Sequence, residues 1–162
     1  MLDYEEEAQR YDGLRGGEPR AAAAAEAVLG LIPEQARELL DVACGTGLVT
    51  RRFAAARPGL SVTGVDLAAA MTRMAASRLP GHVVRGDSRR LPCAGARFDA
   101  VVSVWLLHLL AGPREVAAVI AECARVLRPG GVYVTTVDKG AAHNVGSDID
   151  AVLAARPRSP VH

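Results

Sequence analysis

An acidic residue followed by two glycines marks the first stretch of the chain whose residue types could bind a ligand. Asp41 lies in a short apolar run, and Gly45 and Gly47 follow it with one residue between them. Residues 48–54 then have the pattern of an amphipathic helix. A strand, a tight glycine turn and a helix aim backbone N–H groups and the positive end of a helix dipole at a ligand. Glycine suits such a turn because a Cβ would restrict the backbone angles and hold a ligand away.

Two further acids and two histidines could also take part in chemistry. Asp66 follows a run rich in β-branched residues, where an acid in a doubly wound fold accepts hydrogen bonds from ribose hydroxyls. Asp87 follows a third short run, although Gly-Asp is also ordinary turn chemistry. His108, just past a fourth apolar run, is the first candidate for a general base, and His143 is the second. Either histidine could instead be a capping or packing residue. The four scattered histidines indicate no metal site.

Five strand-like runs alternate with helical patterns, and these elements must position the candidate residues. The runs begin near residues 38, 60, 82, 98 and 132. The clearest helical spacing precedes the last run, and Pro129-Gly130-Gly131 is expected to end that helix. This alternation predicts an α/β fold, a doubly wound Rossmann-like parallel sheet in the order 3-2-1-4-5. A ligand is expected at the carboxyl ends of the first and fourth strands.

These motifs, in this order over residues 38–137, resemble class I S-adenosylmethionine (SAM)-dependent methyltransferases. The first signature of that family is an acid followed by G-x-G-x-G, and here Ala43 fills the first glycine position. Residues 98–103 with Leu107-His108 look like the strand-four signature of the UbiE-like (methyltransferase type 11) branch. Residues 125–131 are similar to the helix-to-strand corner of the same branch. The resemblance implies SAM as the cofactor and a methyltransferase as the activity.

The resemblance also implies a role for each motif. Asp66 would hold the ribose and Asp87 the adenine amino group, while the residues after the fourth strand would line the methionine end. The expected cofactor-binding residues are Tyr11, Arg15, Asp41, Ala43, Cys44, Gly45, Gly47, Asp66, Leu67, Met71, Asp87, Ser88, Ser103, Val104 and Trp105. His108 and His143 are the expected catalytic residues. The sulfonium of SAM makes its methyl group electrophilic, so the protein mainly has to align an acceptor for in-line attack and exclude water.

Two other functions remain open. A dinucleotide-binding G-x-G-x-x-G pattern that starts at Gly45 would place its third glycine at Thr50, which disfavours a nicotinamide dehydrogenase. A catalytically silent SAM-binding module or partner subunit is the alternative to an active enzyme, because the stretch after the fifth strand is short.

Composition narrows the partners and the compartment. The net charge of +1 and the aromatic content of 4% argue against nucleic acid as a partner, so a small-molecule methyl acceptor is expected. The three cysteines show no metal-ligand spacing and indicate reduced thiols in the cytoplasm. No apolar run approaches the roughly 20 residues of a membrane helix. The frequent Ala and Arg hint at a GC-rich bacterial genome.

The chain divides into three predicted parts. Residues 1–17 are expected to be a mobile arm or lid in which Tyr11 covers SAM and Arg15 pairs with its carboxylate; the alternative is a permanently packed or frayed terminus. Residues 18–139 form the SAM-binding core. Residues 140–162 form a loop and a short helix, without the usual β6–β7 hairpin, and this part could be truncated. The fifth strand would then be an exposed edge through which a homodimer could form.

Overall fold

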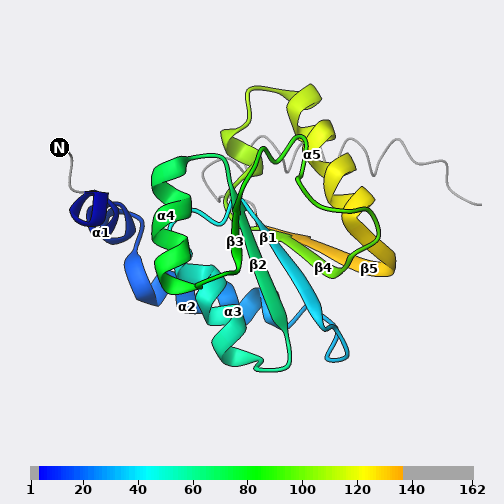
Figure 1. Ribbon diagram of the computed structural model, residues 1–162, viewed down its shortest axis with the longest axis horizontal. Coiled ribbons are helices and arrows are strands. Elements are labelled where there is room, and N and C mark those ends of the chain that lie inside the picture. The colour runs from blue at the N-terminus through cyan, green and yellow to red at the C-terminus, as the bar shows by residue number, and fades with distance from the viewer. Residues whose placement is uncertain (1–3, 137–162) are drawn as a thin grey trace, which may run out of the picture.

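A five-stranded parallel sheet organises residues 4–136, which are the residues that the computed structural model describes (Figure 1). The strands are β1 (Glu38–Val42), β2 (Ser61–Asp66), β3 (Val83–Arg85), β4 (Phe98–Ser103) and β5 (Leu127–Thr135). The helices are α1 (Tyr4–Leu14), α2 (Gly17–Leu29), α3 (Leu48–Ala56), α4 (Ala69–Arg78) and α5 (Pro113–Val126), with a 3-10 turn at Leu107–Leu109. The strand order β3-β2-β1-β4-β5 confirms the predicted doubly wound sheet.

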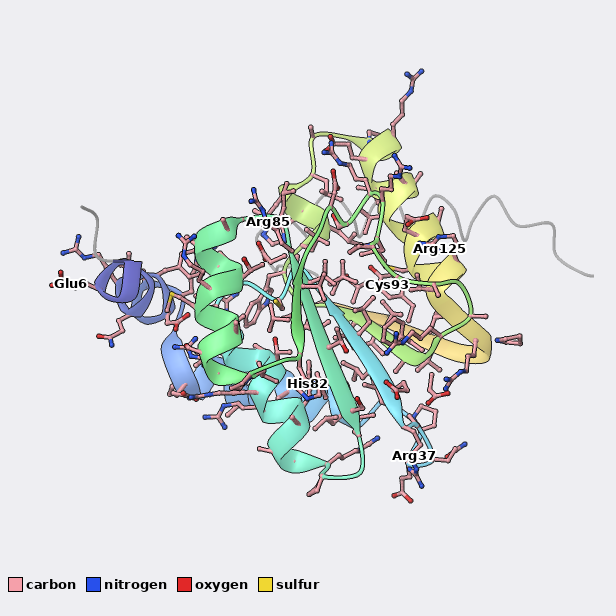
Figure 2. The ribbon with its side chains drawn as sticks, in the orientation of Figure 1. Glu6, Arg37, His82, Arg85, Cys93 and Arg125 are labelled. Atoms are coloured by element: carbon pink, nitrogen blue, oxygen red, sulfur yellow. The ribbon has the colours of Figure 1, made fainter. Side chains whose placement is uncertain are left out.

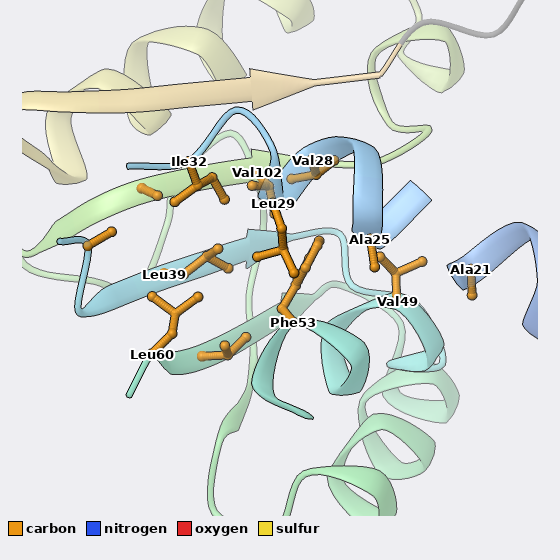
Figure 3. Close-up of a cluster of buried hydrophobic side chains, with 13 residues drawn as sticks. Ala21, Ala25, Val28, Leu29, Ile32, Leu39, Val49, Phe53, Leu60 and Val102 are labelled. Carbon is orange, nitrogen blue, oxygen red and sulfur yellow. The ribbon is translucent and has the colours of Figure 1, made fainter. Parts of the chain in front are cut away.

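Helices cover both faces of the sheet. This agrees with the nearly continuous apolar runs in its central strands, because such strands are buried on both faces. On one face α2 and α3 pack a cluster that includes Val28, Leu39 and Phe53 (Figure 3). On the other face α5 contributes Val119 and Cys123 to a second cluster. Helix α4 lies beside β2 and β3 at one edge, as Figure 1 shows. Because apolar side chains cover both faces, a ligand can reach polar groups of the sheet at the carboxyl ends of the strands.

The strands around the expected ligand site are in register. Asp41 of β1 pairs with Gly64 of β2 and Val102 of β4, so the acid lies in the middle of the sheet. The Cβ that a side chain would add at Gly64 would lie 2.8 Å from the sulfur of Cys44. Glycine at this position therefore makes room for the turn that follows β1.

The last strand begins earlier than the sequence pattern indicated. Helix α5 ends at Val126 and β5 starts at once with Leu127, which pairs with Phe98. The Pro-Gly-Gly stretch therefore lies inside β5, where the pairing with β4 shifts register, and does not form a turn before the strand. Gly130 has a φ of +80°, which allows the chain to bend at this irregularity without leaving the sheet.

The fourth strand gives way to irregular backbone at its carboxyl end. It ends at Ser103, and the chain leaves the sheet through Val104 and Trp105, whose φ of +58° does not fit a strand. The predicted helix and loop of residues 140–162 lie outside the described residues, as does His143.

Candidate functional site

The turn after β1 gives its two glycines different tasks. Gly45 has a φ of +57°, and a Cβ added there would meet nothing within 4 Å, because the residue faces open space. Gly47 has a φ of +78°, and its added Cβ would lie 2.9 Å from the Cα of Ala75 in α4. Gly45 thus leaves room for a ligand, while Gly47 lets α3 and α4 approach each other. Gly47, which was predicted as a cofactor contact, borders neither of the two cavities described below.

Asp66 holds the glycine turn from the end of β2. Its Oδ2 accepts a hydrogen bond of 2.9 Å from the backbone N–H of Gly45, and its Oδ1 accepts one of 2.9 Å from Ala68. Each carboxylate oxygen has a second lone pair that these bonds leave free. Asp66 can therefore fix the turn and accept hydrogen bonds from a ligand at the same time.

Asp41 is buried beneath the turn, with 2% of its surface exposed. The hydroxyl of Thr50 donates to its Oδ2 at 2.7 Å. Burial raises the pKa of Asp41 to about 7, against the lowering effect of the Thr50 hydrogen bond, and the charge of Asp66 raises it further. Near neutral pH this carboxyl therefore exchanges a proton readily, and a cation bound beside it would favour the ionised form. In the sequence, Thr50 was notable only because it occupies the third glycine position of a dinucleotide-binding pattern. In the structure it is the hydrogen-bond partner of the buried Asp41.

Cys44 also lines the first cavity, and its surroundings favour the protonated thiol. Burial raises its pKa far above the ordinary range of a thiol, and the negative charges of Asp41 and Asp66 raise it further.

Two adjoining cavities open at the carboxyl ends of β1, β2 and β4. The first encloses about 270 Å³ and the second about 330 Å³, and Ala43, Asp66 and Leu106 border both. The first is lined by eleven of the predicted site residues, namely Tyr11, Arg15, Asp41, Ala43, Cys44, Gly45, Asp66, Met71, Val104, Trp105 and His108. The second is lined by Leu67, Asp87 and Ser88 together with shared residues. Together they reach the size of typical small-molecule sites, about 300–1,000 Å³.

Ser103 is the second predicted contact that the structure places elsewhere. Its side chain is fully buried, within 2.6 Å of the Tyr133 hydroxyl and 3.0 Å of the Thr135 hydroxyl, and it lines neither cavity. Side chains alternate between the faces of a strand, so the last residue of β4 points toward α5. The residues that follow, Val104 and Trp105, have left the strand and do face the cavity.

Arg20 is a site residue that the sequence reasoning missed. Its guanidinium carbon lies 3.9 Å from the ring centroid of Trp105, and its Nη1 donates to the carbonyl oxygen of Arg15 at 3.0 Å. Arg15 itself stacks on Tyr11 at 5.5 Å. Two arginines thus border the first cavity next to aromatic rings. Arg20 belongs to no motif, because it stands on the first turn of α2 and reaches the site only through the fold.

His108 lies in the 3-10 turn and lines the first cavity. Its Nδ1 is buried and has no hydrogen-bond partner among residues 4–136. A buried ring nitrogen without a partner costs free energy unless a ligand or water meets it. A ligand or water that reached this atom would supply the missing partner.

Asp87 is tied to a neighbour in the second cavity. Arg89 donates to it through Nε at 3.0 Å and Nη2 at 2.8 Å, and reaches Glu115 of α5 through Nη1 at 2.9 Å. The Arg89 hydrogen bonds hold the pKa of Asp87 below its usual range, so the carboxylate stays ionised. Arg89 and Glu115 were not predicted, and both line this cavity.

Within the described part of the chain, no three His, Cys, Asp or Glu side chains gather in a way that could hold a metal ion. None of the helices there is both long and apolar enough to cross a membrane.

The chain is similar in sequence to methyltransferases of quinone metabolism. A ubiquinone biosynthesis O-methyltransferase of Paracidovorax citrulli is 35% identical over 120 residues, which cover 69% of this chain and 48% of that protein. A demethylmenaquinone methyltransferase of Thermotoga maritima is 35% identical over 110 residues, which cover 67% and 45%. The chain thus spans about half the length of these curated relatives.

A solved structure is similar in fold as well. It is that of a SAM-bound amino pentose methyltransferase of Micromonospora echinaspora, with a TM-score of 0.64 and 36% identity over 83% of this chain and 56% of that one. The family model described as a methyltransferase domain matches residues 40–135, which run from β1 to the end of β5. The chain therefore belongs to the methyltransferase domain family, as a class I SAM-dependent methyltransferase of the UbiE-like branch.

Proposed function

We propose that this domain binds SAM across the two adjoining cavities and moves its methyl group to a small-molecule acceptor by in-line attack. The observation that carries the proposal is the open space in front of Gly45, bordered by a carboxylate whose second lone pairs are free. A SAM molecule needs a close backbone approach and a ribose acceptor, and the turn with Asp66 provides both. The residues present therefore fit the cofactor.

Each part of the cofactor has side chains of matching chemistry. Asp66 would accept from the ribose hydroxyls, and Met71, Leu67 and Ser88 would surround the adenine. Three N–H groups of Arg89 already donate to Asp87, which would accept from the adenine amino group through its one remaining lone pair.

The methionine end of the cofactor carries an ammonium and a carboxylate. Asp41 borders the first cavity and would favour the ammonium, while Arg15 and Arg20 would pair with the carboxylate. Arg20 is the better placed of the two, because its stacking on Trp105 fixes the plane of the guanidinium.

Bound SAM supplies a methyl group on a positively charged sulfur, which an acceptor atom attacks. The protein contributes alignment and the removal of a proton from the acceptor. His108 would take that proton on its unpartnered Nδ1. Val104 and Leu106 provide apolar wall, which limits the access of water to the reacting atoms.

A small molecule is the acceptor class best supported. The net charge of +1 is lower than that of proteins that bind the phosphates of nucleic acid through a basic surface. The relatives named above act, by their names, in quinone biosynthesis and on an amino pentose. We also propose a cytoplasmic location, because Cys44, Cys93 and Cys123 are all free thiols. A homodimer would form through β5, an outer strand of the sheet.

Titration calorimetry with SAM and, separately, with NADH tests the cofactor. SAM should bind, NADH should not, and Asp66→Ala should weaken SAM binding by about tenfold or more, because each lost charged hydrogen bond is worth roughly 1.5–3 kcal/mol. Binding of NADH without SAM would refute the proposal. Transfer of a radioactive methyl group from SAM to quinol and amino sugar acceptors then separates an active enzyme from a silent SAM-binding module.

A further inference from the structure

Helix α1 is attached to the rest of the molecule in an unusual way. Of its side chains that the structure describes, Asp12 alone is not exposed. Leu14 is 81% exposed, and Tyr11, Arg10 and Glu6 are exposed as well. Figure 2 shows Glu6 at the far side of α1 from the sheet. No broad apolar face is present among these residues, so the contacts that anchor them are the polar ones of Asp12.

Asp12 is at the centre of a closed set of three contacts. Its Oδ1 accepts a hydrogen bond of 2.6 Å from the hydroxyl of Thr46, and its Oδ2 accepts one of 2.9 Å from Nη2 of Arg78 in α4. Nη1 of the same arginine donates to the carbonyl oxygen of Thr46 at 2.8 Å. The carboxylate and the guanidinium are only 13% and 18% exposed, so solvent screens this pair less than a surface ion pair.

The partner of this contact set is the ligand-binding turn itself. Thr46 stands between Gly45 and Gly47, and it is buried. Helix α1 in turn supplies Tyr11 and Asp12 to the wall of the first cavity, and Arg15 follows directly. Asp12, Thr46 and Arg78 therefore fix both the position of α1 and the shape of the turn.

The connection from α1 to α2 is built to bend. Gly16 stands between the two helices and Gly17 is the first residue of α2, with φ of +87° and +51°, values that glycine adopts without strain. A helix joined through these glycines and anchored by the contacts of Asp12 has an alternative position available once those contacts break.

We propose that Asp12 is a positioning residue that latches α1 to the glycine turn through Thr46 and Arg78, and that the latched helix completes the cofactor cavity. The part of this proposal that concerns SAM rests on the proposed function. When the latch opens, Tyr11 and Arg15 leave the cavity wall and the hydroxyl of Thr46 loses its acceptor on Asp12. The apparent dissociation constant of SAM then rises in inverse proportion to the latched fraction.

Asp12→Asn is the sharpest change, because it keeps the shape and removes the charge. The Asn amide group would have to set a donor against Nη2 of Arg78, or turn it toward the Thr46 hydroxyl. Arg78→Met keeps the apolar stem of the arginine and removes both donors, and the double variant completes a thermodynamic cycle. Glu6→Gln is the matched control, since it removes one negative charge from an exposed site on the same helix.

Hydrogen exchange on residues 4–14 without ligand measures the latch directly. Exchange in α1 should be faster in Asp12→Asn and in Arg78→Met than in the wild type and in Glu6→Gln, while the sheet keeps its protection. Equal exchange in all four proteins would overturn the latch. This measurement needs no cofactor, so it tests the latch even if the proposed function is wrong.

The second measurement is the affinity and release rate of SAM. Each latch variant should bind SAM about tenfold more weakly and release it faster, as expected if the latched fraction falls to about a tenth. The double variant should be no worse than the single ones, because both break the same latch. Unchanged affinity in a variant whose α1 exchanges faster, or effects that simply add, would overturn the coupling to the site. If the wild type binds SAM and only the latch variants bind it weakly, the proposed function still holds.

Discussion

Asp41→Asn should make the protein more stable than the wild type at neutral pH, by an amount that depends on pH. Burial raises the pKa of Asp41 from 3.8 to about 7 in the folded protein. In the unfolded chain the same carboxyl ionises near its ordinary value. Between these two pKa values the unfolded state binds fewer protons than the folded state, so the contribution of Asp41 to stability falls as pH rises. It is fully present below pH 4 and fully lost above about pH 7.

The size of the effect follows from the shift. About three pKa units at roughly 1.4 kcal/mol each give about 4 kcal/mol, an order-of-magnitude figure for a fully buried group. Asparagine keeps an oxygen that can accept the hydrogen bond from Thr50 and carries no charge to bury. The difference in unfolding free energy between Asp41→Asn and the wild type should therefore grow by about 4 kcal/mol from pH 4 to pH 8.

Urea unfolding of both proteins at several pH values measures this difference. Other carboxylates whose pKa is lowered, such as those of Asp99 and Glu122, affect both proteins alike and cancel. Thr50→Val removes the hydrogen bond that lowers the pKa of Asp41, so in that protein the loss of stability should extend to higher pH. A difference between Asp41→Asn and the wild type that stays constant with pH would refute the reasoning.

Three further predictions concern the turn and the base. SAM binding at pH 7 should release a proton from Asp41, so the calorimetric heat should depend on the ionisation enthalpy of the buffer. Asp41→Asn should abolish this dependence, and a dependence that is the same in both proteins would disprove the link. Gly47→Ala should cost about 2–4 kcal/mol in urea unfolding, from its left-handed φ and its contact with Ala75, while Gly45→Ala should cost only about 1–2 kcal/mol yet weaken SAM binding more. The reverse ranking in either assay would count against the separate roles of the two glycines. His108→Gln should lower the rate of methyl transfer about 100-fold or more, with SAM affinity unchanged; an unaltered rate would make His108 a packing residue.

Much of the fold could be predicted because its signals are local. A run of apolar residues indicates each strand. The glycine turn and Asp66 follow at strand ends, and the carboxyl ends of parallel strands lie at the same edge of a sheet. The β5 start could not be predicted in this way. Pro129-Gly130-Gly131 reads locally as a turn, but pairing with β4 carries the chain through it as a bulge.

The site residues that were misplaced or missed depend on three-dimensional detail. Ser103 and Val104 are neighbours in sequence, yet one faces α5 and the other the cavity, because the strand ends between them. Gly47 belongs to the same motif as Gly45, and its approach to Ala75, 28 positions away, becomes visible only in the fold. Asp12 and Arg78 are separated by 66 positions, and nothing in either stretch indicates that they form a pair.

The wall that the two cavities share matters for molecules smaller than the whole cofactor. Ala43, Asp66 and Leu106 border both spaces, so a compound that fills one of them ends at the entrance of the other. Two fragments bound side by side each lose their translational freedom, whereas a single compound that joins them loses it once. With a linker of matching length, the second half then binds as if it were present at about millimolar concentration. Weak nucleoside-like and amino-acid-like fragments, joined across Asp66, should therefore yield a tight ligand although no new protein contact is made.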